Sequence, residues 1–178
     1  RQVFDNVGSS PPSMQAAKSL DGVSLLPGYI GEQADGISAY TQCHLEKTVG
    51  PIPNTCVSLP EARWPKHWHG KYRQPVVPLV LALYGHPSAG DCWEEYAEKR
   101  ICGKGFERIE GWPSTFWHPK HKAMLIVYVD DFKLAAPAEA APIIWKSLGE
   151  VIKLGPSVRM DRLIGCAQEE FKCLVKLL

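Results

Sequence analysis

The chain has 178 residues, of which 45% are hydrophobic and 22% are charged, and its formal net charge at neutral pH is +1. These values are typical of a folded globular domain and exclude a disordered or collagen-like chain. No run of about 18 or more apolar residues is present, so the sequence predicts no membrane span. Because the charge is nearly neutral, any affinity for nucleic acid has to come from local patches.

The first residue and the cysteine spacing bear on processing and on the cellular compartment. The sequence begins at Arg1 rather than Met and shows no signal-peptide pattern, so we expect a fragment or a processed product. The six cysteines include no pair at the spacing of a zinc knuckle or a thioredoxin motif. Several lie among apolar residues, as buried free thiols do. We therefore expect an intracellular protein in the cytoplasm or nucleus, with an organelle left open.

In the first half of the chain the elements are short. Ser10 followed by Pro11 resembles an N-cap with proline at the first helical position. The elements expected up to residue 83 are a helix through Met14, Ala17 and Leu20, a strand ending at Asp35, a short helix through Ala39, Tyr40 and Leu45, and strands at 55–59 and 76–83.

In the second half the periodicity is clearer. Apolar residues recur at helical spacing over 88–102, with Ser88 as the N-cap. The elements expected after it are strands at 106–109, 114–118, 123–128 and 132–135, a helix with Ile143, Ile144 and Leu148 facing inward, and strands at 151–154 and 162–166. Hairpins mixed with helices, without regular alternation, predict an α+β fold.

Between Ala62 and Gly90 the sequence contains no Asp or Glu. Basic and aromatic side chains are interleaved in its first part, namely Arg63, Lys66, Lys71 and Arg73 with Trp64, Trp68 and Tyr72. Such a pattern suits phosphate contacts and base stacking, so the four basic residues are candidates for binding nucleic acid. The alternative is a solvated loop whose Trp side chains enter the core.

Two adjacent carboxylates, Asp130 and Asp131, follow the apolar strand predicted at 123–128. On their own they fit an ordinary hairpin turn, because Asp tolerates turn geometry. A third carboxylate, Asp35, stands at the end of another predicted strand, followed by Gly36 and Tyr40. Carboxylate oxygens are the ligands that Mg²⁺ prefers. Together the three Asp residues predict a site that holds two Mg²⁺ ions for phosphoryl transfer.

The motifs Asp35-Gly36-Ile37-Ser38-Ala39-Tyr40 and Tyr128-Val129-Asp130-Asp131 resemble the two catalytic motifs of reverse transcriptases. Ala82-Leu83-Tyr84-Gly85, with Trp93 on the following helix, resembles the copia type of retrotransposon, as do Gly105-Phe106 and Leu163-Ile164-Gly165-Cys166. The resemblance extends over about residues 30–171. It implies a palm-like antiparallel sheet packed on helices over 31–178, with partial fingers over 1–30 and no thumb.

The resemblance also implies a role for each matching residue. Asp35, Asp130 and Asp131 would be the catalytic metal ligands for two Mg²⁺ ions. Gly36, Tyr40, Tyr84 and Gly85 would bind the incoming nucleotide, with Tyr40 excluding a 2′-hydroxyl, and Tyr128 and Val129 would lie under the primer end. The partners would be an RNA or DNA template–primer and deoxynucleoside triphosphates, and the activity would be RNA-directed DNA polymerisation.

Two alternatives remain. The family usually has Leu-Lys-Gln-Ala-Pro after its Leu-Tyr-Gly, whereas this chain has His86-Pro87-Ser88-Ala89-Gly90. The chain could therefore be a catalytically silent, retroelement-derived subunit that binds other protein subunits of a larger assembly. The second alternative is a metal site built from histidines, although their spacing is not a usual one for ligands: His67, His69, His86, His118 and His121.

Overall fold

The structure is a computed structural model that describes residues 11–45, 55–160, 162–163 and 166–167. The chain divides into two compact units. One contains residues 38–99, and the other contains residues 10–37 together with the chain from residue 100 onward. The prediction of fingers over 1–30 and a palm over 31–178 remains a prediction.

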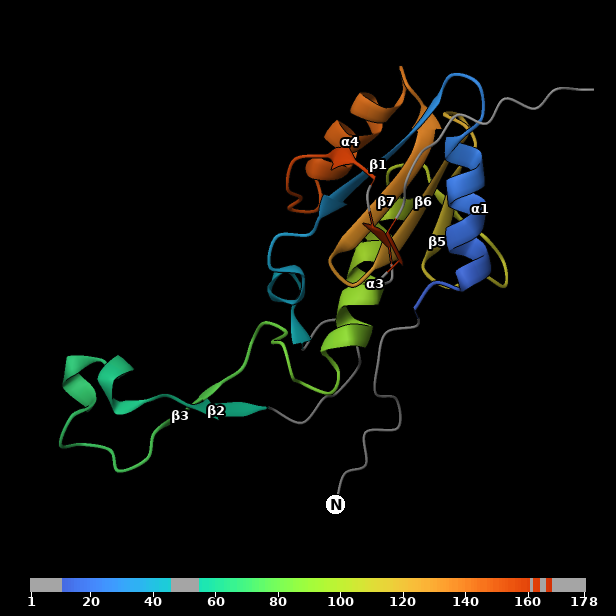
Figure 1. The fold of residues 1–178 in the computed structure, drawn as a ribbon. Helices are drawn as coiled ribbons and strands as arrows, with labels where there is room; N and C mark the ends of the chain where they lie inside the picture. The colour runs from blue at the N-terminus through green and yellow to red at the C-terminus, as the bar shows by residue number, and fades with distance from the viewer. Residues whose placement is uncertain (1–10, 46–54, 161, 164–165, 168–178) are drawn as a thin grey trace, which may run out of the picture. The chain divides into compact units, whose positions relative to one another are not determined.

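The second unit is built on one six-stranded sheet in which every neighbouring pair is antiparallel (Figure 1). Its strands, in spatial order, are β4 (Glu107–Arg108), β5 (Thr115–His118), β6 (Ala123–Tyr128), β7 (Asp131–Pro137), β1 (Tyr29–Asp35) and β8 (Val158–Arg159). The consecutive strands β4 to β7 form a meander, whereas β1 comes from far earlier in the chain and pairs with β7. A two-stranded hairpin of β9 (Arg162–Leu163) and β10 (Cys166–Ala167) follows.

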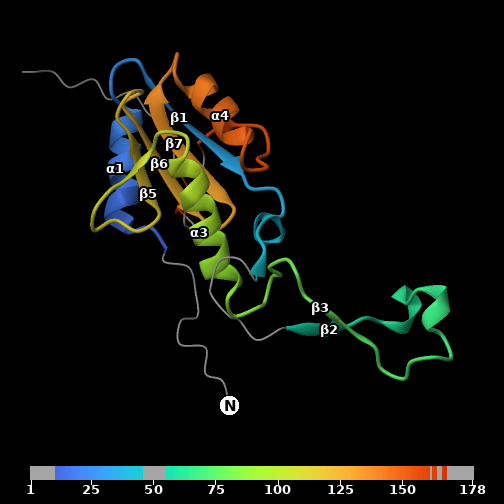
Figure 2. The same cartoon turned by 180° about the vertical axis from the view of Figure 1, so that it is seen from behind.

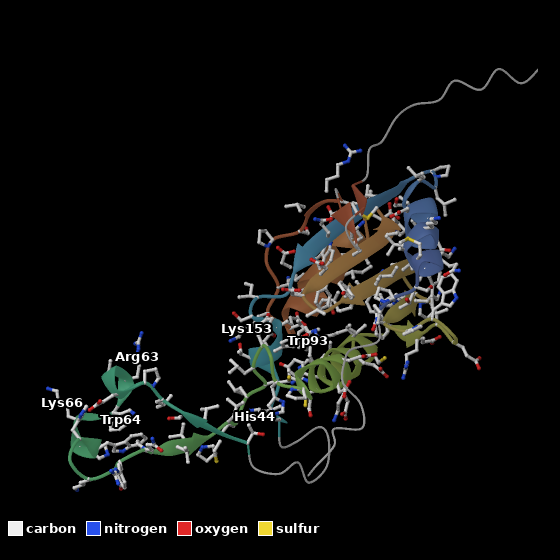
Figure 3. All side chains as sticks on the ribbon, turned by 60° about the horizontal axis from the view of Figure 1, so that its bottom comes forward. His44, Arg63, Trp64, Lys66, Trp93 and Lys153 are labelled. Atoms are coloured by element: carbon white, nitrogen blue, oxygen red, sulfur yellow. The ribbon has the colours of Figure 1, made fainter. Side chains whose placement is uncertain are left out.

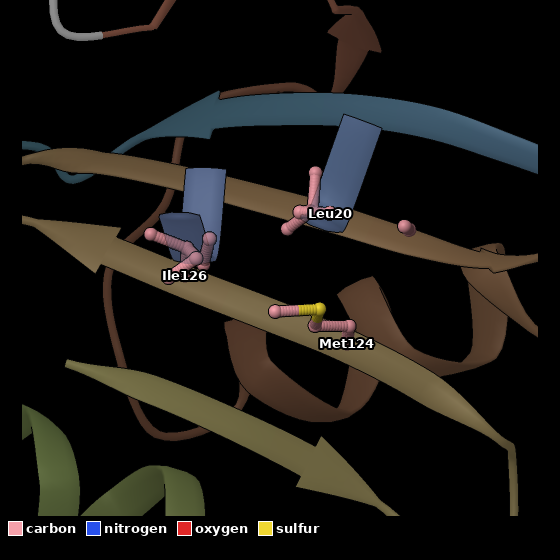
Figure 4. Packing of buried hydrophobic residues seen from close by; sticks show 5 residues of the cluster. Leu20, Met124 and Ile126 are labelled. Atoms are coloured by element: carbon pink, nitrogen blue, oxygen red, sulfur yellow. The ribbon is translucent and has the colours of Figure 1, made fainter. Parts of the chain in front are cut away.

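Helix α1 (Met14–Ser24) covers one face of this sheet. It begins after Ser13, whose side chain accepts a hydrogen bond from the Ala16 N–H at 3.1 Å. Leu20 is fully buried and packs in one cluster with Met124 and Ile126 of β6 (Figure 4). This buried apolar stripe ties the helix to the two central strands, because an isolated helix of this length is marginal in water.

Helix α4 (Ala141–Gly149) covers the opposite face (Figures 1 and 2). Its Trp145 donates a hydrogen bond from Nε1 to Glu32 Oε2 at 2.7 Å. Glu32 lies directly opposite Leu134, which points away from the α1 face because neighbouring residues on a strand alternate. β7 has α1 on one side and α4 on the other, and both β6 and β7 are buried along almost their whole length, which fits their almost continuously apolar sequences.

The first unit contains the 3₁₀ helix Ala39–Gln42, a two-stranded ribbon and most of α3 (Ala89–Cys102). The ribbon pairs β2 (Cys56–Ser58) with β3 (Val76–Pro78). Its base is fastened by the Leu45 N–H, which donates to the Val80 carbonyl at 3.0 Å, and by a bridge between His44 and Leu81. The loop between the two strands carries the 3₁₀ helices Glu61–Arg63 and Lys66–Trp68.

The predicted α+β class is confirmed, and so are the long elements at 14–20, 88–102, 114–118 and 123–128. Several ends differ. The N-cap of α1 is Ser13, and both Pro11 and Pro12 precede the helix; Ser10 lies outside the described residues. The strand predicted over 76–83 ends at Pro78, because proline has no N–H to continue a strand ladder.

Other predictions fail where tertiary contacts decide. The short helix predicted through Leu45 is only a 3₁₀ helix over Ala39–Gln42. The strand predicted at 151–154 is reduced to one bridge, between Leu154 and Gly36. Ile143 was expected to face inward but is 57% exposed, while Ala141 of the same helix is buried. Among the described residues, no helix is long and apolar enough to cross a membrane.

Shortening the central contact of α1 tests this packing. Leu20→Ala is expected to lower the free energy of unfolding by about 2–5 kcal/mol, because it removes fully buried atoms and leaves a cavity. Leu25→Ala is the matched control, since Leu25 is 71% exposed just after the helix, and it should change stability by less than about 0.5 kcal/mol. Urea unfolding measures both, and equal losses would contradict the described packing.

Candidate functional site

The end of β1 and the start of β7 bring two carboxylates together. Asp35 lies directly opposite Asp131 in the antiparallel register, and Asp131 in turn lies opposite Tyr128 of β6. Directly opposite residues have Cβ atoms about 4.5–5.5 Å apart and share a face. The structure therefore places Asp35, which is 95 positions earlier than Asp130 in the sequence (130 − 35), beside the hairpin tip. Two of the three predicted carboxylates therefore come from strand positions that lie opposite each other.

Backbone hydrogen bonds hold the end of β1 in this position. The Gly36 N–H donates to the Asp130 carbonyl at 2.6 Å, and the Gly155 N–H donates to the Asp35 carbonyl at 2.7 Å. A Cβ atom at Gly36 would lie 3.4 Å from the Asp130 carbonyl oxygen, at the edge of ordinary van der Waals contact, so the backbones of β1 and the turn lie close together here. Both sides of the Asp35 backbone are thus fixed by the neighbouring chain.

The turn between β6 and β7 has an unusual backbone. Tyr128 and Asp131 are paired, which leaves Val129 and Asp130 as a two-residue turn. Val129 has a φ of +55°, in the region that such turns usually give to Gly, Asn or Asp. For a β-branched residue this conformation costs about 1–3 kcal/mol and is found most often at functional sites. The strain therefore supports a function for this turn.

Electrostatic repulsion is concentrated at the same place. The pKa of Asp131 is raised above its ordinary value, first because the carboxyl is partly desolvated and then because Asp130 and Asp35 repel its charge. Lys133 acts in the opposite direction. Lys133 is two residues along β7, on the same face as Asp131, and only 1% exposed. A bound cation would relieve the remaining repulsion.

Lys133 is a residue near the candidate site that sequence analysis did not single out. The available signal is a single cation inside the apolar stretch Phe132–Ala136, where a charged residue is buried only if it has a partner. Its register partners are Gln33 of β1 and Ile126 of β6. Sequence alone could not show that its face also carries Asp35 and Asp131.

The candidate metal ligands do not form a preassembled coordination site in the described residues. Among the residues that the structure describes, no three His, Cys, Asp or Glu side chains come close enough together to hold a metal ion. The same observation disfavours the histidine alternative, since the rings of His118 and His121 lie 4.6 Å apart without a third ligand. Oxygen ligands from Asp35, Asp130 and Asp131 still fit Mg²⁺ chemically, because it is a hard ion that often keeps several waters.

Two residues of the first unit that are predicted to bind a nucleotide, Tyr40 and Tyr84, contact each other through their rings. The rings of Tyr40 and Tyr84 lie 4.5 Å apart between centroids, tilted by 47°. Tyr40 is half-buried, and Tyr84 is 51% exposed. Gly85 follows with a φ of +88°, a conformation that favours glycine. The roles of Tyr40, Tyr84 and Gly85 in binding a nucleotide remain predictions.

His86 begins the segment in which the resemblance leads us to expect Leu-Lys-Gln-Ala-Pro. Its Nδ1 accepts a hydrogen bond from the Ser88 N–H at 3.2 Å, next to the start of α3. Its Nε2 lies 3.1 Å from Thr55 Oγ1. The imidazole therefore links the start of the ribbon to the start of the helix.

The basic and aromatic segment predicted to bind nucleic acid is exposed to solvent. Side chains of Arg63, Lys66, Lys71 and Arg73 are exposed, and Trp64 and Trp68 are half-buried. Figure 3 labels Arg63, Trp64 and Lys66 of this segment. The expectation that the Trp side chains enter the core is therefore wrong. No residue from 55 to 81 is buried, because the ribbon has no layer of its own unit packed over it.

Relief of strain at Val129 gives a test of the turn. Val129→Gly is expected to raise the free energy of unfolding by about 1 kcal/mol, because glycine adopts a positive φ without steric cost. Val127→Gly is the control in the adjoining strand, where Val127 is 6% exposed, and it should lower stability by about 2–4 kcal/mol. Chemical denaturation measures both. A loss of stability in Val129→Gly would show that the turn is not strained.

Removing the charge of Asp131 tests the repulsion. With a raised pKa, the folded state holds the proton more tightly than the unfolded chain, so stability is lost as the pH rises through that pKa. Asp131→Asn is therefore expected to be more stable than the parent at pH 7, with a difference that shrinks toward about pH 4. Unfolding curves across this range measure it, with the exposed Glu139→Gln as control. A difference that is constant with pH would contradict the repulsion.

Comparison with known proteins gives no relative from which a role could be transferred. The chain matches no protein-family model, no curated protein and no solved structure. The function therefore has to be inferred from the geometry of the carboxylates and from the chemistry of the surrounding residues.

Proposed function

We propose that this chain is the palm-like core of a nucleotidyltransferase that extends a primer on an RNA or DNA template, as a reverse transcriptase of the copia type does. The observation that carries the proposal is the β1–β7 register, in which Asp35 lies directly opposite Asp131 at the tip of the Tyr128–Asp131 hairpin. Three carboxylates, two of which directly follow a strained residue, Val129, are more than a plain hairpin needs.

In the proposed mechanism, Asp35, Asp130 and Asp131 would hold two Mg²⁺ ions. Such ions would lower the pKa of a primer 3′-hydroxyl and neutralise charge on the triphosphate and the leaving pyrophosphate. The hydrogen bonds of Gly36 and Gly155 keep the Asp35 backbone in place, which lowers the cost of ordering the site. Lys133 lies on the same face, and its charge lowers the pKa of Asp131 against the repulsion of Asp130 and Asp35.

The remaining predicted roles complete the proposal. Tyr128 and Val129 would support the primer end, since the fixed turn presents them next to Asp130. Tyr40 would exclude a ribose 2′-hydroxyl, and its contact with Tyr84 limits the positions that its ring can take. Substrates would be deoxynucleoside triphosphates with a template–primer.

The second candidate is a catalytically silent subunit of a larger assembly. Two observations favour it: His86 is used structurally where the family has its Leu-Lys-Gln stretch, and no group of three metal-binding side chains is preassembled in the described part of the chain. Such a subunit would keep the sheet and the hairpin as inherited structure and would bind other proteins.

A primer-extension assay with Mg²⁺ separates the two candidates. The parent is expected to extend a primer, and Asp130→Ala should lower the rate by roughly a thousandfold, because a metal contact worth several kcal/mol is lost. Glu139→Ala, an exposed carboxylate beyond the other end of β7, is the control and should retain the parent rate. No extension by a folded parent, together with stable co-purification of other subunits, would support the silent subunit instead.

A further inference from the structure

The loop at the end of the β2–β3 ribbon is an unusual structure for its size. It comprises residues 59–75, here named the aromatic head, and connects two strands of three residues each. A two-stranded ribbon is marginally stable in water by itself, and loops longer than about 15 residues in compact domains are usually functional. No side chain of the ribbon or of the head is buried, so a hydrophobic core does not explain this element.

The head is nevertheless ordered by its own local contacts. Trp64 donates a hydrogen bond from Nε1 to the Leu59 carbonyl at 2.8 Å, and its ring lies 5.7 Å from the ring of His69. The rings of Trp68 and Tyr72 lie 6.0 Å apart in an edge-on arrangement. These contacts hold a set of aromatic rings at the surface, and Tyr72 is 55% exposed.

The charge of the head is strongly one-sided. It carries four basic residues and one acidic residue, Glu61, which gives a formal charge of +3 (4 − 1) against +1 for the whole chain. Glu61 lies 3.8 Å from His69, with both side chains largely exposed. Arg63 and Lys66 point away from the loop, whereas Trp64 lies within it (Figure 3). The basic groups are Arg63, Lys66, Lys71 and Arg73, and all four are exposed.

We propose that the aromatic head binds single-stranded nucleic acid, with its basic side chains on the phosphates and the faces of Trp68 and Tyr72 against unpaired bases. Charge complementarity selects a polyanion, and exposed rings select one whose bases are free to stack. In a duplex the bases already stack on each other, so the rings would add little. The inference concerns binding and holds whether or not the three Asp residues are catalytic.

Binding of a fluorescent oligothymidine of about 12 nucleotides, measured by anisotropy in EDTA, tests the proposal. The parent is expected to bind it at least about tenfold more tightly than a hairpin duplex of the same length. The double variant Lys66→Gln/Lys71→Gln should weaken binding about tenfold and reduce the salt slope by about 1.4, because each phosphate contact on a single strand contributes about 0.7. Lys18→Gln/Lys120→Gln, two exposed lysines outside the head, is the matched control and should bind like the parent.

Stacking is tested separately at Tyr72, whose exposure makes substitution compatible with folding. Tyr72→Ala should weaken binding of the single strand about tenfold, whereas Tyr72→Phe should retain it, because only the ring is required. Equal affinity for single strand and duplex, or unchanged binding in the lysine and Tyr72→Ala variants, would overturn the proposal. If the parent extends a primer but the head variants bind single strands as well as the parent does, only the proposal for the aromatic head is contradicted. If the head binds single strands as expected but the parent extends no primer, only the proposed catalysis is contradicted.

Discussion

The site depends on one constraint, the antiparallel pairing of β1 with β7. These strands come from distant parts of the chain, and seven residue pairs in register connect them, from Tyr29 with Pro137 to Asp35 with Asp131. A slip of one residue would turn the side chains of β1 to the other face. The register is supported from both faces, since α1 contacts β1 and β7 on one and Trp145 of α4 donates a hydrogen bond to Glu32 of β1 on the other. The packing of the helices therefore sets where Asp35 lies.

That pairing concentrates negative charge and strain at one end of the sheet. Asp131 is repelled by Asp130 and Asp35, and Val129 is held at a positive φ. Neither feature stabilises the fold, and both persist because the surrounding sheet leaves the chain no alternative. Lys133, buried under the same face, offsets part of the repulsion. Proteins commonly keep such local costs at sites where function requires them.

The two units present different kinds of surface. The sheet unit has a rigid backbone around its carboxylates, fixed by the hydrogen bonds of Gly36 and Gly155. The ribbon of the other unit has no buried side chain and depends on local ring contacts and turns. A rigid set of carboxylates suits chemistry that needs precise positioning, whereas an exposed basic and aromatic head suits a flexible polyanion.

The sequence by itself determined the α+β class, the apolar strand before Asp130, the helix over 88–102 and the identity of the three Asp candidates, because hydrophobic periodicity and turn residues are local signals. It also located the basic and aromatic stretch. Only the tertiary structure decided that Asp35 lies opposite Asp131, that Lys133 is buried on the same face of the sheet, and that Trp64 and Trp68 are only half-buried. Strand register and burial arise from long-range pairing and from the helices that cover each face, and a local pattern carries no information about either.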